Sequence, residues 1–457
     1  MIDRQIWKEA KYTDGRGGLN LLMNQQKAHV EKLGLKELIA MGVGGMVGGG
    51  IFSVLGLSVA LSGHAAPIAF ALGGLIALLT GFSYTKLGLT YHSDGGSFTY
   101  LEHAFKHRNI SGIGGWLLLT GYIGTLALYA YTFGVYGTAM FGKNVQGHAM
   151  HHLLESLVLL LFLGINLYGI KAAGKSEDVI VMVKVLILSL FAVVGLFYVR
   201  ADHILPVFNL GKTGVLMGAA LIFVAYEGFE LIPNAVNEME NPAQNLGRGI
   251  LISIVITTAI YILVSLVAVG NLLPEEISRY KEYALAAAAR PFLGKSGFML
   301  IGLGALLSTA SAINATLFGT ARLGMVMARE SELPQVFSHK ERTKDIPYVS
   351  LISITVLSLL FVNTTDLTII SSFASSTFLL IFAAINLSAI RLRIRIGINL
   401  GIPLAGLALT LASWVVLCFY LFKTNWKALE WIGGLYLCVI ASELFFSERK
   451  IIFKQKN

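Results

Sequence analysis

Long apolar runs, separated by short polar stretches, extend over most of the chain. A helix needs about 20 apolar residues to cross the hydrocarbon core of a bilayer, and a window of that length finds twelve such runs. Their approximate ranges are 35–61, 66–91, 111–141, 151–171, 176–199, 214–236, 247–273, 297–328, 348–362, 366–390, 400–422 and 427–446. The pattern predicts an all-α integral membrane protein with twelve transmembrane helices.

The composition strengthens this prediction. The 457 residues are 55% hydrophobic and only 13% charged, whereas an average soluble protein is roughly 25% charged. A soluble chain of this size has too little interior for so much apolar surface, so we expect a multi-pass protein of the cell membrane. The first 34 residues are polar and mixed in charge, without the apolar stretch of a cleavable signal peptide.

The distribution of Lys and Arg predicts the orientation. If both termini are cytoplasmic, 25 of the 35 basic side chains lie on the cytoplasmic side and nine on the other side, with Lys184 inside a span. This bias follows the positive-inside rule and predicts that the N- and C-termini both face the cytoplasm. The same distribution explains the net charge of +9 without nucleic acid as a partner.

The first apolar run contains VGGMVGGGIFSVLG, with five glycines between Gly44 and Gly50. Glycine costs about 1 kcal/mol relative to alanine in a helix interior, so this density favours a break in the helix. A break at membrane depth is tolerated where it lines a cavity, and it offers N–H groups to an anion and carbonyls to a cation. The alternative is a small-residue packing face, which needs glycine only at every fourth position. A nucleotide-binding loop is excluded because no strand precedes the glycines.

The sixth run, LIFVAYEGFELIPNAVNEMENPAQN, has Gly228 and Pro233 in its middle, beside Glu227 and Glu230. It is a second predicted broken helix, five helices after the first, as expected when helices 1–5 and 6–10 form inverted repeats. We therefore expect three parts. They are a cytoplasmic extension (1–34), a core of helices 1–10 (35–390) with repeats at about 35–199 and 214–390, and helices 11 and 12 with a cytoplasmic tail (391–457).

Four segments together resemble the amino acid-polyamine-organocation (APC) superfamily of permeases. They are MVGGGIF, YHSDGGSFTYLEHAF, FVAYEGFE with NEMENPAQNLGRGI, and NATLFGTARLGMVMARESELPQVF, which occur in the family's order between residue 38 and about residue 350. The stretches VKVLILSLF and ALAAAARPFLGKSGFMLIGLG are similar to proton-coupled amino acid transporters of that superfamily. The resemblance implies the LeuT-like fold, with helices 1 and 6 broken.

The resemblance also implies a substrate site between the two breaks. The expected ligands are the N–H groups of Gly49 and Gly50, beside Gly48, for the substrate carboxylate, and the carbonyls of Met46, Val224, Ala225 and Glu227 for its amine. Tyr226 and Phe229 flank the second break, and one of these rings is expected to close over the substrate.

Lys184 interrupts the apolar run DVIVMVKVLIL. An ammonium group in hydrocarbon is costly, and about eight residues of helix place it about 12 Å from the membrane surface, beyond the reach of its stem. A partner inside the protein is therefore preferred to snorkelling. By resemblance, Lys184 stands where sodium-coupled relatives bind a cation, so it is expected to donate to the Gly44 carbonyl and to hydroxyls of Ser308, Thr309 or Ser311. Gain and loss of its proton are then expected to couple to transport.

Other polar residues are less specific signals. Glu227 either faces the cavity, where it favours a cation or a proton, or pairs with a polar group on a neighbouring helix. Glu230 is expected to shape the break from within the scaffold. His103 and His107 lie four residues apart, but a solvated helix face is preferred to a metal site, and no metal is expected.

With the resemblance, the chain is expected to be a proton-coupled symporter that imports amino acids across the cytoplasmic membrane, with the proton as coupling ion and no cofactor. The alternatives are an amino acid or amine exchanger on the same fold, a cation transporter, and an intramembrane enzyme. The sequence has no HExxH motif or paired intramembrane aspartates, which argues against the enzyme. A small-molecule substrate and membrane lipid are the expected partners. The preferred side chain and the oligomeric state are not predicted.

Overall fold

The computed structural model describes residues 32–93, 95–105, 108–142, 149–168, 174–330, 332–340 and 346–446. Within these ranges the chain forms helices and one isolated bridge, between Leu33 and Met239. The expected all-α class is therefore confirmed. Most of the expected N-terminal extension and the end of the C-terminal tail lie outside the described residues.

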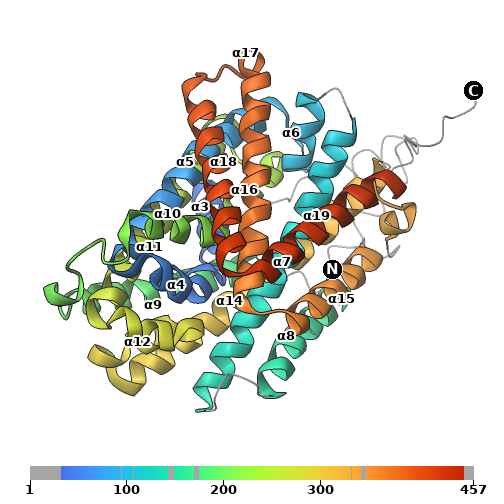
Figure 1. The fold of residues 1–457 in the computed structure, drawn as a ribbon. Helices are drawn as coiled ribbons and strands as arrows, with labels where there is room; N and C mark the ends of the chain where they lie inside the picture. The colour runs from blue at the N-terminus through green and yellow to red at the C-terminus, as the bar shows by residue number, and fades with distance from the viewer. Residues whose placement is uncertain are drawn as a thin grey trace, which may run out of the picture.

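The helices form one bundle (Figure 1). Its first half contains α3 (Leu35–Met46), α4 (Gly50–Ser62), α5 (Ala66–Thr90), α6 (Gly96–Ala104), α7 (Arg108–Met140), α8 (Ala149–Tyr168) and α9 (Gly174–Leu196). Next come α10 (Gly211–Leu221), the 3-10 segments η4 (Phe223–Tyr226) and η5 (Phe229–Glu238), α11 (Pro242–Asn271), α12 (Pro274–Arg279), η6 (Lys281–Tyr283), α13 (Ala284–Ala288) and α14 (Arg290–Arg329). The chain ends with α15 (Tyr348–Thr364), α16 (Leu367–Arg391), α17 (Arg393–Ile396), α18 (Gly401–Thr424) and α19 (Trp426–Phe446).

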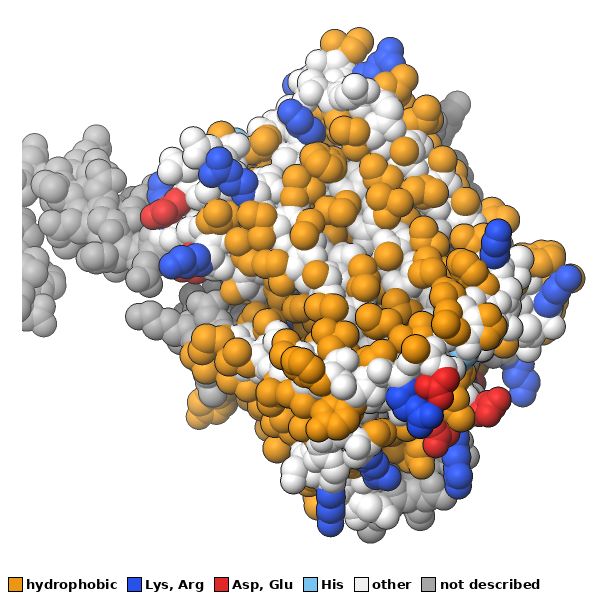
Figure 2. Space-filling view, turned by 90° about the vertical axis from the view of Figure 1, so that its left-hand side faces the viewer, with side chains coloured by type: hydrophobic (Ala, Val, Ile, Leu, Met, Phe, Trp, Pro, Cys, Tyr) orange, Lys and Arg blue, Asp and Glu red, His pale blue; other side chains and the backbone are white. Residues whose placement is uncertain are grey.

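Membrane-spanning helices make up most of the described chain. Nine are long and apolar enough to cross a bilayer, and the bent pair α10 with η4–η5 brings the number to ten. This count takes Gly50–Thr90 as one span, and it leaves out α15, a shorter apolar helix of 17 residues. Figure 2 shows the matching surface, where hydrophobic side chains gather over a broad central area and Lys and Arg lie towards its edges. Twelve spans in a LeuT-like arrangement remain a prediction.

The first predicted break is confirmed at Val47–Gly49. Helix α3 ends at Met46, Val47 leaves the helical region with φ −78° and ψ 36°, and α4 begins at Gly50. The glycines also serve close packing, because a Cβ on Gly45 would lie 3.0 Å from the Gly228 Cα. The break and the packing interpretations of the glycine cluster are therefore both correct.

The second predicted break is also present. After α10, the chain forms η4, passes through extended backbone at Glu227 (ψ 154°), and turns at Gly228, whose φ of 117° strongly favours glycine. Pro233 lies inside η5, where its missing N–H group prevents a regular helix. The axes before and after the break differ by 52°.

The interior of the bundle surrounds these breaks. Helices α7 and α16 are the most enclosed, with 78% and 83% of their most apolar windows buried, whereas α18 and α19 are only 22% buried. In Figure 1, α16 crosses the middle of the molecule between α18 and α19. Residues that line the breaks are therefore shielded by α7 and α16, whereas α18 and α19 lie at the outside of the bundle.

Candidate functional site

The two breaks lie directly against each other. A Cβ on Gly228 would be 2.6 Å from the carbonyl carbon of Gly45 and 2.7 Å from the Met46 nitrogen. A Cβ on Gly50 would be 2.7 Å from the Ala225 Cα. Backbone from α3, α4 and the η4–η5 junction is thus brought together by residues without side chains, as expected for a site that binds a small ligand through main-chain groups.

The break leaves the last carbonyls of α3 without their usual helical partners. Side chains from two other helices donate hydrogen bonds to two of these carbonyls. Lys184 on α9 donates to the Gly44 carbonyl with an Nζ–O distance of 2.7 Å, and the Tyr261 hydroxyl on α11 donates to the Met46 carbonyl at 2.6 Å. The C-terminal end of a helix carries partial negative charge, so it favours a cation such as the Lys184 ammonium.

Tyr261 connects the two breaks. Its hydroxyl oxygen is 2.6 Å from the Met46 carbonyl and 3.0 Å from the Ala225 carbonyl, and its side chain is fully buried. Both carbonyls belong to the set expected to bind the substrate amine. Tyr261 is therefore the donor that occupies these two carbonyls in the structure. The sequence did not single out Tyr261, although a tyrosine in an apolar run needs a partner for its hydroxyl.

The Lys184–Gly44 contact that the resemblance implies is present in the structure. Lys184 is fully buried, so the alternative of snorkelling to the membrane surface is wrong. Gly44 permits this approach, because a Cβ there would lie 2.8 Å from Val181 on α9. A role of the contact in proton coupling remains a prediction.

Of the three hydroxyls expected as partners of Lys184, that of Ser308 does not accept a hydrogen bond from it. The Ser308 hydroxyl on α14 is buried, yet among the described residues it has no hydrogen-bond partner. Thr309, the next residue, donates to the Ala305 carbonyl within its own helix at 2.8 Å. Ser311 lies farther along α14 and is half-buried. Adjacent helical positions differ by about 100° in direction, which is why the sequence does not determine which hydroxyl faces α9.

Expected donors to the substrate carboxylate lie at the start of α4. Its N-cap is Gly49, which has no side chain to satisfy the first N–H groups of the helix. The ring of Tyr129 on α7 lies against Gly49, and Ala312 on α14 lies against Gly48, where a Cβ would be 2.8 Å from the alanine Cβ. A ligand at these N–H groups is therefore bordered by α7 and α14.

Two carboxylates lie buried beside the second break. Glu227 accepts a hydrogen bond from Thr125 at 2.6 Å, and Glu230 accepts from the Gly228 N–H at 2.6 Å and from Tyr122 at 3.2 Å. Thr125 and Tyr122 share one face of α7. The structure shows the polar neighbour of Glu227 on α7, while a role of the carboxylate towards a cation or proton in the site remains a prediction. No Lys, Arg or His of the described chain forms an ion pair with either acid.

The aromatic residues predicted to close over the substrate pack into the scaffold. Tyr226 donates to the Phe70 carbonyl on α5 at 2.5 Å, and Phe229 packs edge-on against Tyr84 with ring centres 5.6 Å apart. The aromatic ring of Tyr129, which sequence patterns did not reveal, lies against Gly48 and Gly49, and closure of Tyr226 or Phe229 over the substrate remains a prediction.

The break is also tied to α16. Ser375 accepts from the Val224 N–H at 3.0 Å and donates to the Leu221 carbonyl at 2.6 Å. Val224 therefore has its N–H satisfied within the protein.

The two histidines considered as a metal site are not brought together among the described residues. His103 stacks on Tyr91 with ring centres 4.2 Å apart, and His107 lies outside the described residues.

Comparison with known proteins agrees with this architecture. The family model described as "Amino acid permease" matches residues 33–431. An uncharacterized protein of Methanocaldococcus jannaschii is 33% identical over 417 residues, covering 91% of this chain and 95% of the relative. The inner membrane transport protein YbaT of Escherichia coli is 32% identical over 430 residues, covering 92% and 98%.

A more distant relative carries a more specific name. The serine/threonine exchanger SteT of Bacillus subtilis is 27% identical over 357 residues, covering 75% of this chain and 80% of the relative. The family consists of transporters and not of enzymes. With the match of the family model over most of its length, the chain belongs to the amino acid permease family of multi-pass membrane transport proteins.

Proposed function

We propose that this permease is a proton-coupled symporter that imports amino acids across the cytoplasmic membrane. In this proposal both termini are cytoplasmic, and residues 35–390 form the transport core from two inverted repeats. The observation that supports it most is the buried hydrogen bond from Lys184 Nζ to the Gly44 carbonyl, 2.7 Å long, which joins α9 to the last turn of the broken helix.

The proposed substrate site uses the main chain of both breaks. The substrate carboxylate binds the N–H groups of Gly49 and Gly50 at the uncapped start of α4. The ammonium binds the carbonyls of Met46 and Ala225, where it takes the place of the Tyr261 hydroxyl proton. Because these are backbone groups, they recognise the part that all amino acids share and leave the side chain to residues around them.

The proposed coupling follows from the charge on Lys184. A charged ammonium makes a hydrogen bond roughly twice as strong as a neutral amine does, and it also interacts with the negative end of α3. Protonation therefore tightens α3 against α9, and proton loss loosens it. If the outward- and inward-facing states differ in this contact, they bind the proton with different affinity, and proton binding is linked to the conformational change.

The buried acids fit a site that receives mobile cations. Glu227 and Glu230 lie beside the break, and no described basic residue forms an ion pair with either. A buried charge without a partner is costly, so an arriving proton or substrate ammonium is a suitable counterion for a carboxylate here. This makes Glu227, which extends from the break to Thr125, a proposed member of the binding set.

Exchange is the second candidate, because SteT is named as an exchanger. An experiment with proteoliposomes separates the two. For one proton per substrate, an inward gradient of one pH unit corresponds to about 1.4 kcal/mol and to about tenfold accumulation. Symport predicts this accumulation in empty vesicles without sodium. Uptake that requires amino acid inside the vesicles, and does not respond to the pH gradient, would instead establish exchange.

A further inference from the structure

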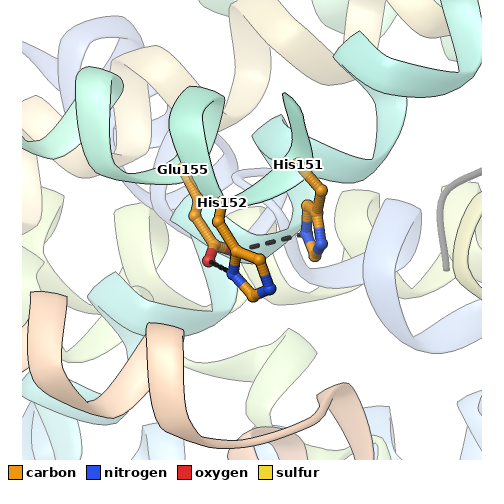
Figure 3. A group of neighbouring side chains, drawn as sticks. All are labelled: His151, His152 and Glu155. Atoms are coloured by element: carbon orange, nitrogen blue, oxygen red, sulfur yellow. Dashed lines mark hydrogen bonds and ion pairs between the residues drawn. The ribbon is translucent and has the colours of Figure 1, made fainter. Parts of the chain in front are cut away.

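A second polar cluster lies away from the breaks, at the start of α8. His151, His152 and Glu155 belong to its first two turns, and Figure 3 shows both imidazole rings beside the carboxylate. His152 Nδ1 is 2.7 Å from one glutamate oxygen, and His151 Nε2 is 3.2 Å from the other. At 100° per residue, position 155 lies between positions 151 and 152 around the helix, so the helix itself directs the three side chains to one point.

Burial makes this cluster unusual. The Glu155 side chain is fully buried and His151 is 7% exposed, whereas His152 is 54% exposed. Among the described residues no Lys or Arg forms an ion pair with Glu155, and one of its oxygens accepts no hydrogen bond. A carboxylate buried with two imidazoles, and reached from solvent past one of them, is a preformed set of ligands for a metal ion.

We propose that His151, His152 and Glu155 bind a divalent transition-metal ion of the zinc class. Imidazole nitrogen and carboxylate oxygen are the ligands that suit such ions. Tetrahedral coordination with bonds of about 2.0–2.1 Å separates ligand atoms by about 3.3 Å. With one ligand atom from each residue, the three atoms lie within 4.8 Å of one another. Each imidazole nitrogen already lies beside its own carboxylate oxygen, at 2.7 Å for His152 and 3.2 Å for His151. The exposed side of His152 leaves the fourth position to water.

Binding requires a change of tautomer. His151 Nε2 also lies 3.3 Å from the Tyr131 carbonyl, and it donates there only when it holds the ring proton. A nitrogen that ligates a metal must be free of its proton. In the metal-bound form, His151 therefore has its proton on Nδ1 and His152 has its proton on Nε2, so that both ligating nitrogens are free of hydrogen.

Tyr131 connects the cluster to η6, which lies against α4. The Tyr131 ring on α7 lies edge-on to His151 with centres 4.6 Å apart, and its hydroxyl donates to Glu282 in η6 at 2.7 Å. The neighbouring Lys281 carbonyl lies against Gly56 of α4. A bound ion fixes His151 and with it Tyr131, so it should restrain η6 over α4 and slow transport. This consequence rests on the proposed transport function, but the metal site does not.

The test is direct metal binding to purified protein without a histidine tag. Zn²⁺ titration calorimetry should give one ion per chain for the wild type, and Co²⁺ should give the intense visible absorption of a tetrahedral site. His152→Ala, at an exposed position, should weaken Zn²⁺ binding at least about 100-fold, since even indirect partners of ligands contribute 10- to 100-fold. His339→Ala, at another exposed histidine far from α8 in sequence, should bind like the wild type.

Two results would overturn the metal site. They are no saturable Zn²⁺ binding to the wild type, and equal binding by wild type and His152→Ala. The transport consequence has its own readout, because Zn²⁺ should slow amino acid uptake by the wild type and not by His152→Ala. Stoichiometric binding without an effect on uptake would keep the site and refute its link to α4. A wild type that binds Zn²⁺ but transports no amino acid would refute the proposed function alone.

Discussion

Gly228→Ala tests whether contact between the two breaks sets the structure of the site. The substitution forces a side chain onto a residue with φ 117°, a conformation that costs about 1–3 kcal/mol for residues other than glycine. The new Cβ would also lie 2.6 and 2.7 Å from backbone atoms of Gly45 and Met46. Backbone cannot move aside as a flexible side chain can, and overpacking of this kind costs about 1–3 kcal/mol. The expected loss of stability is therefore about 2–6 kcal/mol.

The assay is thermal unfolding of the purified protein, with amino acid uptake measured in parallel. The matched control is Gly319→Ala on α14, because a Cβ there meets nothing within 4 Å and alanine favours a helix by about 1 kcal/mol. Gly319→Ala should unfold at or above the wild-type temperature, while Gly228→Ala should unfold much earlier and lose uptake. If Gly228→Ala keeps wild-type stability and uptake, the two breaks do not pack as described.

Two further variants test the groups around the break. Tyr261→Phe removes the donor to the Met46 and Ala225 carbonyls, which should destabilise the empty protein by about 1–3 kcal/mol and tighten substrate binding up to about tenfold in calorimetry, because the substrate ammonium meets no competitor. Unchanged stability and affinity would contradict this role. Glu227→Gln keeps an acceptor for Thr125 but removes the negative charge proposed to bind the substrate ammonium. A hydrogen bond to a charged group contributes about 1.5–3 kcal/mol. Uptake by Glu227→Gln at low substrate concentration should fall tenfold or more with thermal stability retained, and wild-type uptake would remove Glu227 from the binding set.

Local sequence was sufficient to locate the breaks and the buried lysine. Three consecutive glycines at 48–50, and Gly228 with Pro233, each conflict with a continuous helix for reasons that involve only neighbouring residues. An ammonium at Lys184, too deep to reach the surface, requires a partner inside the protein. The structure provides that partner at Gly44. These predictions hold because their physical cause is short-range.

Sequence patterns missed the residues that reach the site from helices distant in the chain, because packing between those helices determines their positions. Tyr261 meets Met46 across 215 positions of the chain, and neither residue has a local signal of that contact. Tyr129 reaches Gly49 for the same reason. Ser308 was one of three hydroxyls expected to accept from Lys184, and it has no hydrogen-bond partner among the described residues. The His151–His152–Glu155 cluster did have a signal, since HHLLE at the start of a helix directs all three side chains to one face.

Gradient-driven uptake by Lys184→Met tests whether the charge on Lys184 couples amino acid transport to the proton. Methionine keeps an unbranched side chain of similar length but cannot bind a proton, and Lys295→Ala, at an exposed position on α14, is the matched control. In sodium-free proteoliposomes with an inward gradient of one pH unit, the wild type and Lys295→Ala should accumulate labelled amino acid about tenfold. Lys184→Met should only equilibrate it, with exchange of internal for external substrate retained. Equal accumulation by Lys184→Met and wild type would show that Lys184 is structural and would contradict the coupling mechanism.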